Sequence, residues 1–286
     1  MTTPSLPRAA IPAARHPLAV SFPLSRVGTL ATNLWHHREL LWHLAVRNLR
    51  SQYKQSMLGY VWIVMNPAIY LLTLSFVFST VLRTPSEGVP FALFLCAGFV
   101  PWLFFSSALL LATDSLTGAA SLVTMVYFPR EILAAAAVLV RVIDLGAGFL
   151  ILVGLLAFNG YSLTGSAAWI PLILLVHIVF TIGLSLPLAA LNLFFHDVRF
   201  LVGVGLNLWF FLTPIIYPVD VVPARYRVLY DFNPNTWFIE AYRGALLHGT
   251  GPSTENLLWS AATALLTLVA GYYFFKRVEP AFADRI

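Results

Sequence analysis

Charged residues are scarce in this chain of 286 residues: they make up 10% of it, whereas hydrophobic residues make up 59%. A soluble domain carries roughly 25% charged residues, and a soluble fold of this length could not bury so much apolar surface. The composition therefore excludes a soluble protein and indicates one that is embedded in a membrane.

Cysteine is nearly absent, and so are the motifs of nucleotide and metal chemistry. Cys96 is the single cysteine, which excludes an internal disulfide and a cysteine metal cluster. The sequence has no G-x-x-x-x-G-K-[ST] phosphate loop, no G-x-G-x-x-G loop after a strand, no H-E-x-x-H and no Asp-x-Asp pair. Apart from His36-His37, the histidines are scattered. We therefore predict that this chain holds no metal or cofactor of its own and has no catalytic residues.

Residues 1–30 are rich in proline and lack an uninterrupted apolar core. A cleaved signal peptide requires such a core. The sequence thus predicts a flexible tail over 1–30, followed by a single transmembrane domain over 31–286.

An amphipathic helix is predicted over residues 33–56. Apolar residues recur there every four positions, and cationic residues lie mostly elsewhere on the helical wheel. The apolar positions are Leu41, Ala45, Leu49 and Tyr53, with Trp42 and Val46 beside them, and the cations are Arg38, Arg47, Arg50 and Lys54. This pattern is typical of a helix in the headgroup layer. A short cytoplasmic helix packed on another domain is the alternative.

Six apolar stretches follow, which predicts an all-α membrane protein with six transmembrane helices. Each stretch approaches or exceeds the ~20 residues that cross ~30 Å of hydrocarbon. The stretches cover residues 57–82, 91–113, 132–158, 168–195, 200–217 and 256–275.

The basic residues predict the orientation. With six spans both termini lie on one side of the membrane, and twelve basic residues fall on that side: Arg8, Arg15, Arg26, Arg38, Arg47, Arg50, Lys54, Arg130, Arg199, Lys276, Arg277 and Arg285. Four fall on the other side: Arg83, Arg225, Arg227 and Arg243. The positive-inside rule then places both termini in the cytoplasm.

The connection 114–131 is cytoplasmic in this topology and yet moderately apolar. It ends in Tyr127-Phe128-Pro129-Arg130-Glu131. An exposed apolar segment indicates a protein partner, and a loop tucked against the bundle is the alternative.

Two ionisable residues, Arg141 and Asp144, lie within the third span. Their spacing lets them meet on one helix face. Charges in a span pair or face a polar interior, so the two residues indicate either an ion site or a self-neutralised pair.

The connection 218–255 is long and rich in aromatic residues, and its spacing predicts two short amphipathic helices at the outer face of the membrane. Backbone that leaves the helical state at membrane depth needs protein or water around it. We therefore predict that these helices re-enter the membrane at the mouth of a passage.

Several short motifs together resemble a known family. They are Arg47–Pro67, Pro101-Trp102 with Phe104-Phe105, Tyr127–Glu131, Phe195–Arg199, Thr213–Tyr217 and Asn233-Pro234. In this order and spacing, over residues 30–280, the chain resembles the permease subunit of type-2 ABC exporters for bacterial surface polysaccharides such as O-antigen, teichoic acid and capsule. Where that family has a more charged turn after the fourth span, this chain has His196-Asp197-Val198-Arg199.

The resemblance implies a homodimer in the bacterial inner membrane that works with two nucleotide-binding ATPase subunits, which bind ATP and magnesium. It implies that 33–56 is an interface helix, that 114–131 contains a coupling helix for the ATPase, and that 218–248 forms gate helices. The substrate would be a glycan on an undecaprenyl-type lipid, with no nucleic acid involved. Aromatic residues would guide its sugars near the exit, and the candidates are Trp209, Phe210, Tyr217, Tyr230 and Trp237.

Three other functions fit the composition. An exporter of the same architecture could move a drug or a lipid. A membrane enzyme acting on lipid-linked sugars would need a cluster of acids or histidines at one membrane face, and the sequence shows no catalytic spacing of that kind. An ion-coupled transporter would show internal inverted repeats, which are not evident.

Overall fold

The computed structural model describes residues 23–54, 56–120, 122, 128–282 and 285, and within these residues every regular element is a helix. The α-helices are α1 (Pro23–His36), α2 (Arg38–Tyr53), α3 (Trp62–Ser75), α4 (Phe91–Thr113), α6 (Glu131–Phe158), α7 (Ile170–Phe194), α8 (Val198–Phe211), α9 (Ala224–Asp231), α10 (Pro234–Arg243) and α11 (Thr254–Val278).

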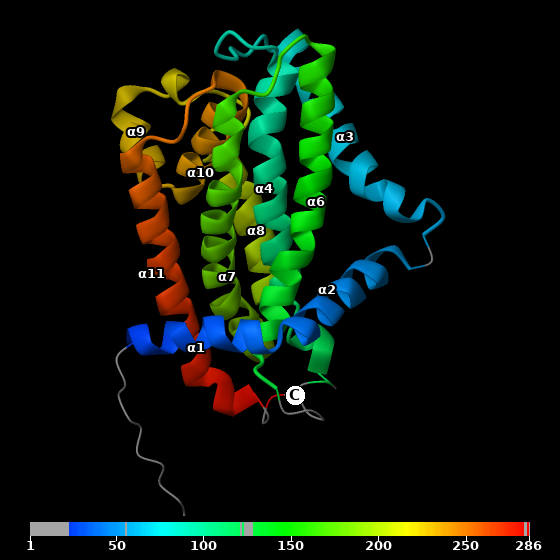
Figure 1. Cartoon of the computed structure of the whole chain (residues 1–286), viewed down its shortest axis with the longest axis vertical. Coiled ribbons are helices and arrows are strands. Elements are labelled where there is room, and N and C mark those ends of the chain that lie inside the picture. The colour runs from blue at the N-terminus through cyan, green and yellow to red at the C-terminus, as the bar shows by residue number, and fades with distance from the viewer. Residues whose placement is uncertain (1–22, 55, 121, 123–127, 283–284, 286) are drawn as a thin grey trace, which may run out of the picture.

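Four long helices, α4, α6, α7 and α11, run along the long axis of the molecule (Figure 1). At one end, which we call the α1 end, α1 lies across the bundle, α6 begins, and α7 and α11 finish. The opposite end, the α9 end, carries α9 and α10. The first described helix and the end of the last long one therefore meet the same end of the bundle.

Within the described part of the chain, five helical stretches are long and apolar enough to span a membrane, where the sequence predicted six. They are Gly59–Val81, Phe91–Thr113, Glu131–Phe158, Gly165–Phe194 and Thr254–Phe282. The fifth predicted span, 200–217, contains only α8, whose 14 residues end at Phe211. A helix of that length rises ~21 Å, short of the ~30 Å of hydrocarbon. Pro214 explains the early end, because proline cannot donate a helical hydrogen bond and its ring clashes with the preceding turn.

The core of the bundle surrounds α4. In its most apolar window 78% of the residues are buried, against 11% in the stretch Gly59–Val81 that contains α3. The π-helical turn Phe76–Val81 prolongs α3 toward the loop before α4. Consequently α3 lies at the periphery with most of its apolar side chains uncovered, whereas α4 is enclosed on nearly all sides.

The amphipathic segment before the first span differs from the single helix predicted over 33–56. It consists of α1 and α2, which are separated at His37, where the backbone leaves the helical range (φ −102°, ψ 25°). The helical structure already begins at Pro23, a residue that favours the first position of a helix. Of the tail predicted over 1–30, residues 1–22 lie outside the described residues.

Two glycines bring α7 and α11 into backbone contact. A Cβ built on Gly183 would lie 2.6 Å from the backbone nitrogen of Leu268, and one on Gly271 would collide with the carbonyl oxygen of Gly183. Small residues that allow such close approach are typical of helix packing in membranes. The contact holds the last spanning helix against the bundle.

We expect Gly271→Ala to lower the free energy of unfolding by about 1–3 kcal/mol, because the added methyl group overpacks an interface that has backbone on both sides. The measurement is the thermal unfolding midpoint of the purified protein in detergent. Gly154→Ala is the matched control, since a Cβ there meets nothing within 4 Å. Equal midpoints for the two variants would contradict the prediction.

Candidate functional site

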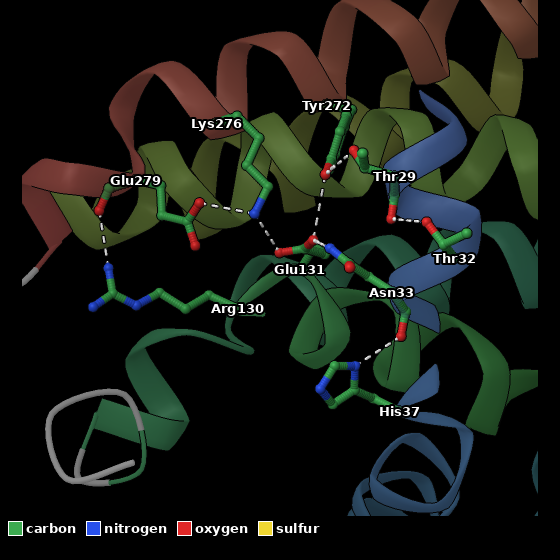
Figure 2. A network of polar contacts seen from close by, with 9 residues as sticks. All are labelled: Thr29, Thr32, Asn33, His37, Arg130, Glu131, Tyr272, Lys276 and Glu279. Carbon is green, nitrogen blue, oxygen red and sulfur yellow. Dashed lines mark hydrogen bonds and ion pairs between the residues drawn. The ribbon is translucent and has the colours of Figure 1, made fainter. Parts of the chain in front are cut away.

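Glu131 joins three helices at the α1 end (Figure 2). Its carboxylate is fully buried and accepts hydrogen bonds from Asn33 Nδ2 of α1 at 2.9 Å and from Lys276 Nζ of α11 at 2.8 Å. The Tyr272 hydroxyl lies 3.4 Å from it and 3.2 Å from the Thr29 hydroxyl of α1. A buried carboxylate is stable only when it is paired in this way. We call this network the Glu131 junction.

The neighbouring Arg130 contacts the end of the chain. Its guanidinium donates to the backbone oxygen of Glu279 at 2.9 Å and lies 5.7 Å from the centroid of the Phe282 ring. Lys276 also pairs with the Glu279 carboxylate at 2.9 Å. These residues surround a cavity of about 480 Å³ lined by Asn33, Phe128, Pro129, Arg130, Lys276, Glu279 and Pro280. The C-terminal turn thus supports the end of the 114–131 connection.

The residues proposed for docking on an ATPase have different environments. Tyr127 lies outside the described residues. Phe128 is buried, and Glu131 is buried in the junction. Pro129 and Arg130 border the cavity and are partly exposed. Because the Glu131 carboxylate faces the chain's own α1 and α11, it acts on a partner only through those helices.

The start of the same connection is held by Asn192, a fully buried residue of α7. Its amide nitrogen donates to the Thr113 carbonyl at 3.1 Å and to the Asp114 carboxylate at 3.2 Å. Its amide oxygen accepts from the backbone N–H of Arg199, in the first turn of α8, at 3.1 Å. One side chain thereby connects the 114–131 segment to both α7 and α8.

A basic groove runs between α2 and the chain before α3. Arg47, Arg50 and Lys54 line it together with Tyr53 and Tyr60, whose ring centroids are 5.5 Å apart. The groove has a volume of about 870 Å³. Within the described residues, no ion pair with an acidic side chain joins any of the three cations. A groove of this composition suits anionic lipid headgroups.

Arg141 and Asp144 form an ion pair with an Nη1–Oδ2 distance of 2.7 Å on α6. Their side chains are 14% and 16% exposed. Tyr53 of α2 lies near this pair: burial raises the pKa of its hydroxyl, and the Asp144 charge adds to that effect. The geometry is that of mutual neutralisation at the contact between α2 and α6, and an ion-binding role for the pair stays a prediction.

At the α9 end, Asn233 fastens α10 to the tip of α8. Its side-chain oxygen accepts from the Trp209 indole N–H at 2.8 Å and from the backbone N–H of Asn235 at 3.1 Å. Its amide nitrogen donates to the Leu212 carbonyl and to the Thr213 hydroxyl, each at 3.0 Å. Asn233 is therefore the N-cap of α10 and also satisfies a carbonyl at the end of α8.

The other end of α10 is fixed by Arg243, which is fully buried. Its guanidinium donates to the carbonyls of Pro214 and Ile215, both at 2.7 Å, and pairs with Glu240 at 3.1 Å. It also lies 3.6 Å from the ring centroid of Phe94 on α4. Burial raises the pKa of Glu240, and the Arg243 charge opposes that shift. The turn after α8 and the helix α10 are thus bound to the central helix.

The aromatic candidates form separate contacts. Phe210 packs 5.8 Å from Trp102 on α4, and the indole of Trp209 is 6.4 Å from the same ring. The hydroxyls of Tyr217 and Tyr230 are 2.7 Å apart. Trp237 pairs instead with a residue of α11, Trp259, at 6.3 Å. The structure therefore brings Trp209 and Phe210 together, joins Tyr217 to Tyr230, and places Trp237 against another helix.

The sequence predicted no structural role for four of these residues, namely Asn192, Asn233, Arg243 and Lys276. The role of Asn192 could have been predicted, because a polar side chain inside an apolar span costs free energy unless it is hydrogen-bonded. Asn-Pro at the start of α10 is a recognisable N-cap. Arg243 was counted as an outer loop charge, and nothing in its neighbourhood in the sequence indicated burial.

Comparisons with known proteins agree with this architecture. Residues 39–247 match the family described as ABC-2 type transporter. The O-antigen export system permease protein RfbA of Klebsiella pneumoniae is 30% identical over 257 residues, which cover 88% of this chain and 96% of that protein. The RfbA of Myxococcus xanthus is 28% identical, over 90% of this chain and 99% of the relative. The polysialic acid transport protein KpsM of Escherichia coli is 22% identical, over 83% and 93%.

Proposed function

Since the chain belongs to the ABC-2 type transporter family, we propose that it is the membrane permease of an ATP-driven exporter that moves a lipid-linked surface polysaccharide across the bacterial inner membrane. The observation that carries this proposal is the full-length similarity to permeases named for O-antigen and polysialic acid export. These relatives are transport permeases, so this chain is a transport subunit and not an enzyme.

The distribution of charge supports a cytoplasmic position for the α1 end. Basic residues belong to the elements that lie, begin or finish at that end: Arg38, Arg47, Arg50 and Lys54 in and directly after α2, Arg130 directly before α6, Arg199 in the first turn of α8, and Lys276 and Arg277 at the end of α11. Toward the α9 end, Arg83 before α4 and Arg225 and Arg227 of α9 are exposed, whereas Arg243 is buried against carbonyls. An excess of Lys and Arg marks the cytoplasmic side. In this orientation α9 and α10 lie at the outer face, where gate helices would control the exit.

The 114–131 segment is the proposed contact for the ATPase. Its first residue, Asp114, is held by Asn192, and its last residue, Glu131, is held in the Glu131 junction at the α1 end. A segment anchored at both ends transmits a push from a partner into the bundle. We propose that two copies of this chain and two ATPase subunits form the exporter, with ATP and magnesium bound by the ATPase subunits.

We expect an ATPase subunit to co-purify with the tagged, detergent-solubilised chain from its own cells, and Gly118→Trp to reduce that co-purification strongly. Gly118 is an exposed residue of the segment, and an added Cβ there meets no described atom within 4 Å, so a large side chain at this position starts in open space where a partner would dock. Gly165→Trp is the matched control, because Gly165 is equally open but precedes α7 at the other end of the bundle.

Three outcomes separate the alternatives. If no ATPase co-purifies with the unaltered chain, the exporter function is wrong. If Gly118→Trp binds the ATPase as well as Gly165→Trp does, the function stands and the contact lies elsewhere. Deletion of the gene should remove polysaccharide from the cell surface, and unchanged surface polysaccharide would favour an exporter of a drug or a lipid.

A further inference from the structure

We propose that α8 is a strut that connects the 114–131 segment to the outer helix α10, and that Asn192 and Asn233 are the positioning residues that fasten its two ends. The proposal rests on the function proposed above, since it explains how movement at an ATPase contact reaches an exit at the other end of α8. It adds roles for two buried asparagines and for the one apolar helix that is too short to span the membrane.

The first attachment uses all the polar atoms of the Asn192 side chain. Its amide nitrogen donates to the carbonyl of Thr113, the last residue of α4, and to the carboxylate of Asp114, the first residue of the segment. Its oxygen accepts from the N–H of Arg199, which belongs to the first turn of α8, where backbone N–H groups have no partner inside the helix. Any displacement of Asp114 therefore acts on the first turn of α8 through one rigid amide.

The second attachment mirrors the first. Leu212 lies directly after α8, where carbonyl groups lack partners inside the helix, and Asn233 donates to its oxygen. The Trp209 indole in the last turn of α8 donates back to the same asparagine. Asn233 in turn caps α10 through the backbone N–H of Asn235. The end of α8 and the start of α10 are thus joined by hydrogen bonds in both directions.

Between these attachments α8 packs on α4 through Trp209 and Phe210, and most of its other side chains are exposed. Of its 14 residues only Leu206 is buried, and four of its large apolar side chains are more than 60% exposed, namely Phe200, Leu201, Leu208 and Phe211. A single uninterrupted helix with ~21 Å of length is stiff along its axis. A stiff element that is hydrogen-bonded at both ends moves as one body. This is the arrangement that transfers a displacement from one end to the other.

The test compares Asn192→Leu, Asn233→Leu and the double variant in the complete complex with its ATPase. Leucine has the same number and branching of side-chain heavy atoms as asparagine and makes none of its hydrogen bonds. We expect each single variant to reduce the glycan exported per ATP hydrolysed by about tenfold, a size found for residues on coupling networks. Because the two attachments act in series, the double variant should be no worse than either single variant. Losses that multiply in the double variant would overturn the proposal.

A second readout separates transmission from a merely structural effect. Val221 is exposed near α9, and Cys96 is the single natural cysteine and is buried. In a Cys96→Ala background, Val221→Cys reports the α9 end through its maleimide labelling rate with and without ATP. We expect Asn192→Leu, at the opposite end, to abolish the ATP-dependent change in labelling. A change that persists in this variant would overturn the proposal.

Matched controls come from the same helices. Ser185 on α7 and Tyr242 on α10 are buried, and neither hydroxyl has a hydrogen-bond partner within the described residues. Ser185→Ala and Tyr242→Phe should keep both the export ratio and the labelling change. Loss in these controls as large as in the asparagine variants would contradict a specific attachment.

Milder variants keep the test decisive if a leucine variant does not fold. Asp114→Ala and Trp209→Phe each delete one hydrogen bond and leave the asparagine in place. Both should shift export per ATP in the same direction by a smaller factor, and normal values in both would overturn the strut. If the unaltered complex neither hydrolyses ATP nor exports glycan, the proposed function fails instead, so the two failures are distinguishable.

Discussion

Replacing Arg243 by methionine is expected to lower the free energy of unfolding by about 3–5 kcal/mol, the cost of breaking a buried charged contact by removing one partner. The guanidinium holds two adjacent carbonyls, those of Pro214 and Ile215, and no other described donor bonds them. Methionine fills much of the space and offers no donor. The two carbonyls and the Glu240 carboxylate then lose the partner that compensates their burial.

The contacts of the Arg243 guanidinium predict a series of variants with graded losses of stability. Lysine preserves the charge but has a single nitrogen in place of the planar fork, so it cannot bond both carbonyls and Glu240 at their present positions. Arg243→Lys should therefore lose less stability than Arg243→Met. Gly98→Ala should produce a milder form of the same defect, because its Cβ would lie 2.9 Å from Arg243 Nη2.

The measurement for this series is the thermal unfolding midpoint in detergent, together with export by cells that carry each variant. Arg227→Met is the control, since Arg227 is an exposed arginine of α9 with a long 3.9 Å contact to Asp220. The order expected for the midpoint is the unaltered chain and Arg227→Met, then Gly98→Ala and Arg243→Lys, and lowest Arg243→Met. A midpoint for Arg243→Met equal to that of Arg227→Met would show that the buried contacts contribute nothing.

The spanning helices could be predicted from the sequence because apolar length decides them. In hydrocarbon every backbone polar group must be bonded within the element, so a long apolar run has only the helix available. The predicted span 200–217 contains Pro214, and its helix ends at Phe211. The sequence alone did not show whether another element would bond the backbone groups that follow the helix. The structure supplies donors for this turn through Arg243, which bonds the successive carbonyls of Pro214 and Ile215.

The polar junctions could not be predicted because their partners are far apart in the sequence. Glu131 contacts Asn33 and Lys276, which lie 98 and 145 positions away. The local pattern presented Glu131 as the polar end of an exposed loop, and only the packing of α1 and α11 turns it into a buried group. The same holds for Asn192, whose partners Thr113 and Asp114 are 79 and 78 positions away.

Glu131 gives the second large expected effect: Glu131→Leu should lower the free energy of unfolding by about 3–5 kcal/mol, again because one member of a buried ion pair is removed. Leucine leaves Asn33 Nδ2 without its acceptor and takes from Lys276 its closest anion. The start of α6 would then separate from α1 and α11. Since the 114–131 segment ends at this residue, we also expect less glycan to be exported per ATP hydrolysed.

Two companion variants test the cause of that loss. Glu279→Gln removes the other acidic partner of Lys276, but this carboxylate is 22% exposed, and ion pairs open to water contribute only ~0–1 kcal/mol. In the double variant Glu131→Leu with Lys276→Met, the uncompensated cation disappears, so part of the stability should return, as it does when apolar residues replace both members of a buried pair. A double variant less stable than Glu131→Leu alone would mean that Lys276 stabilises the junction through Glu279 and the cavity beside Arg130, and not through Glu131.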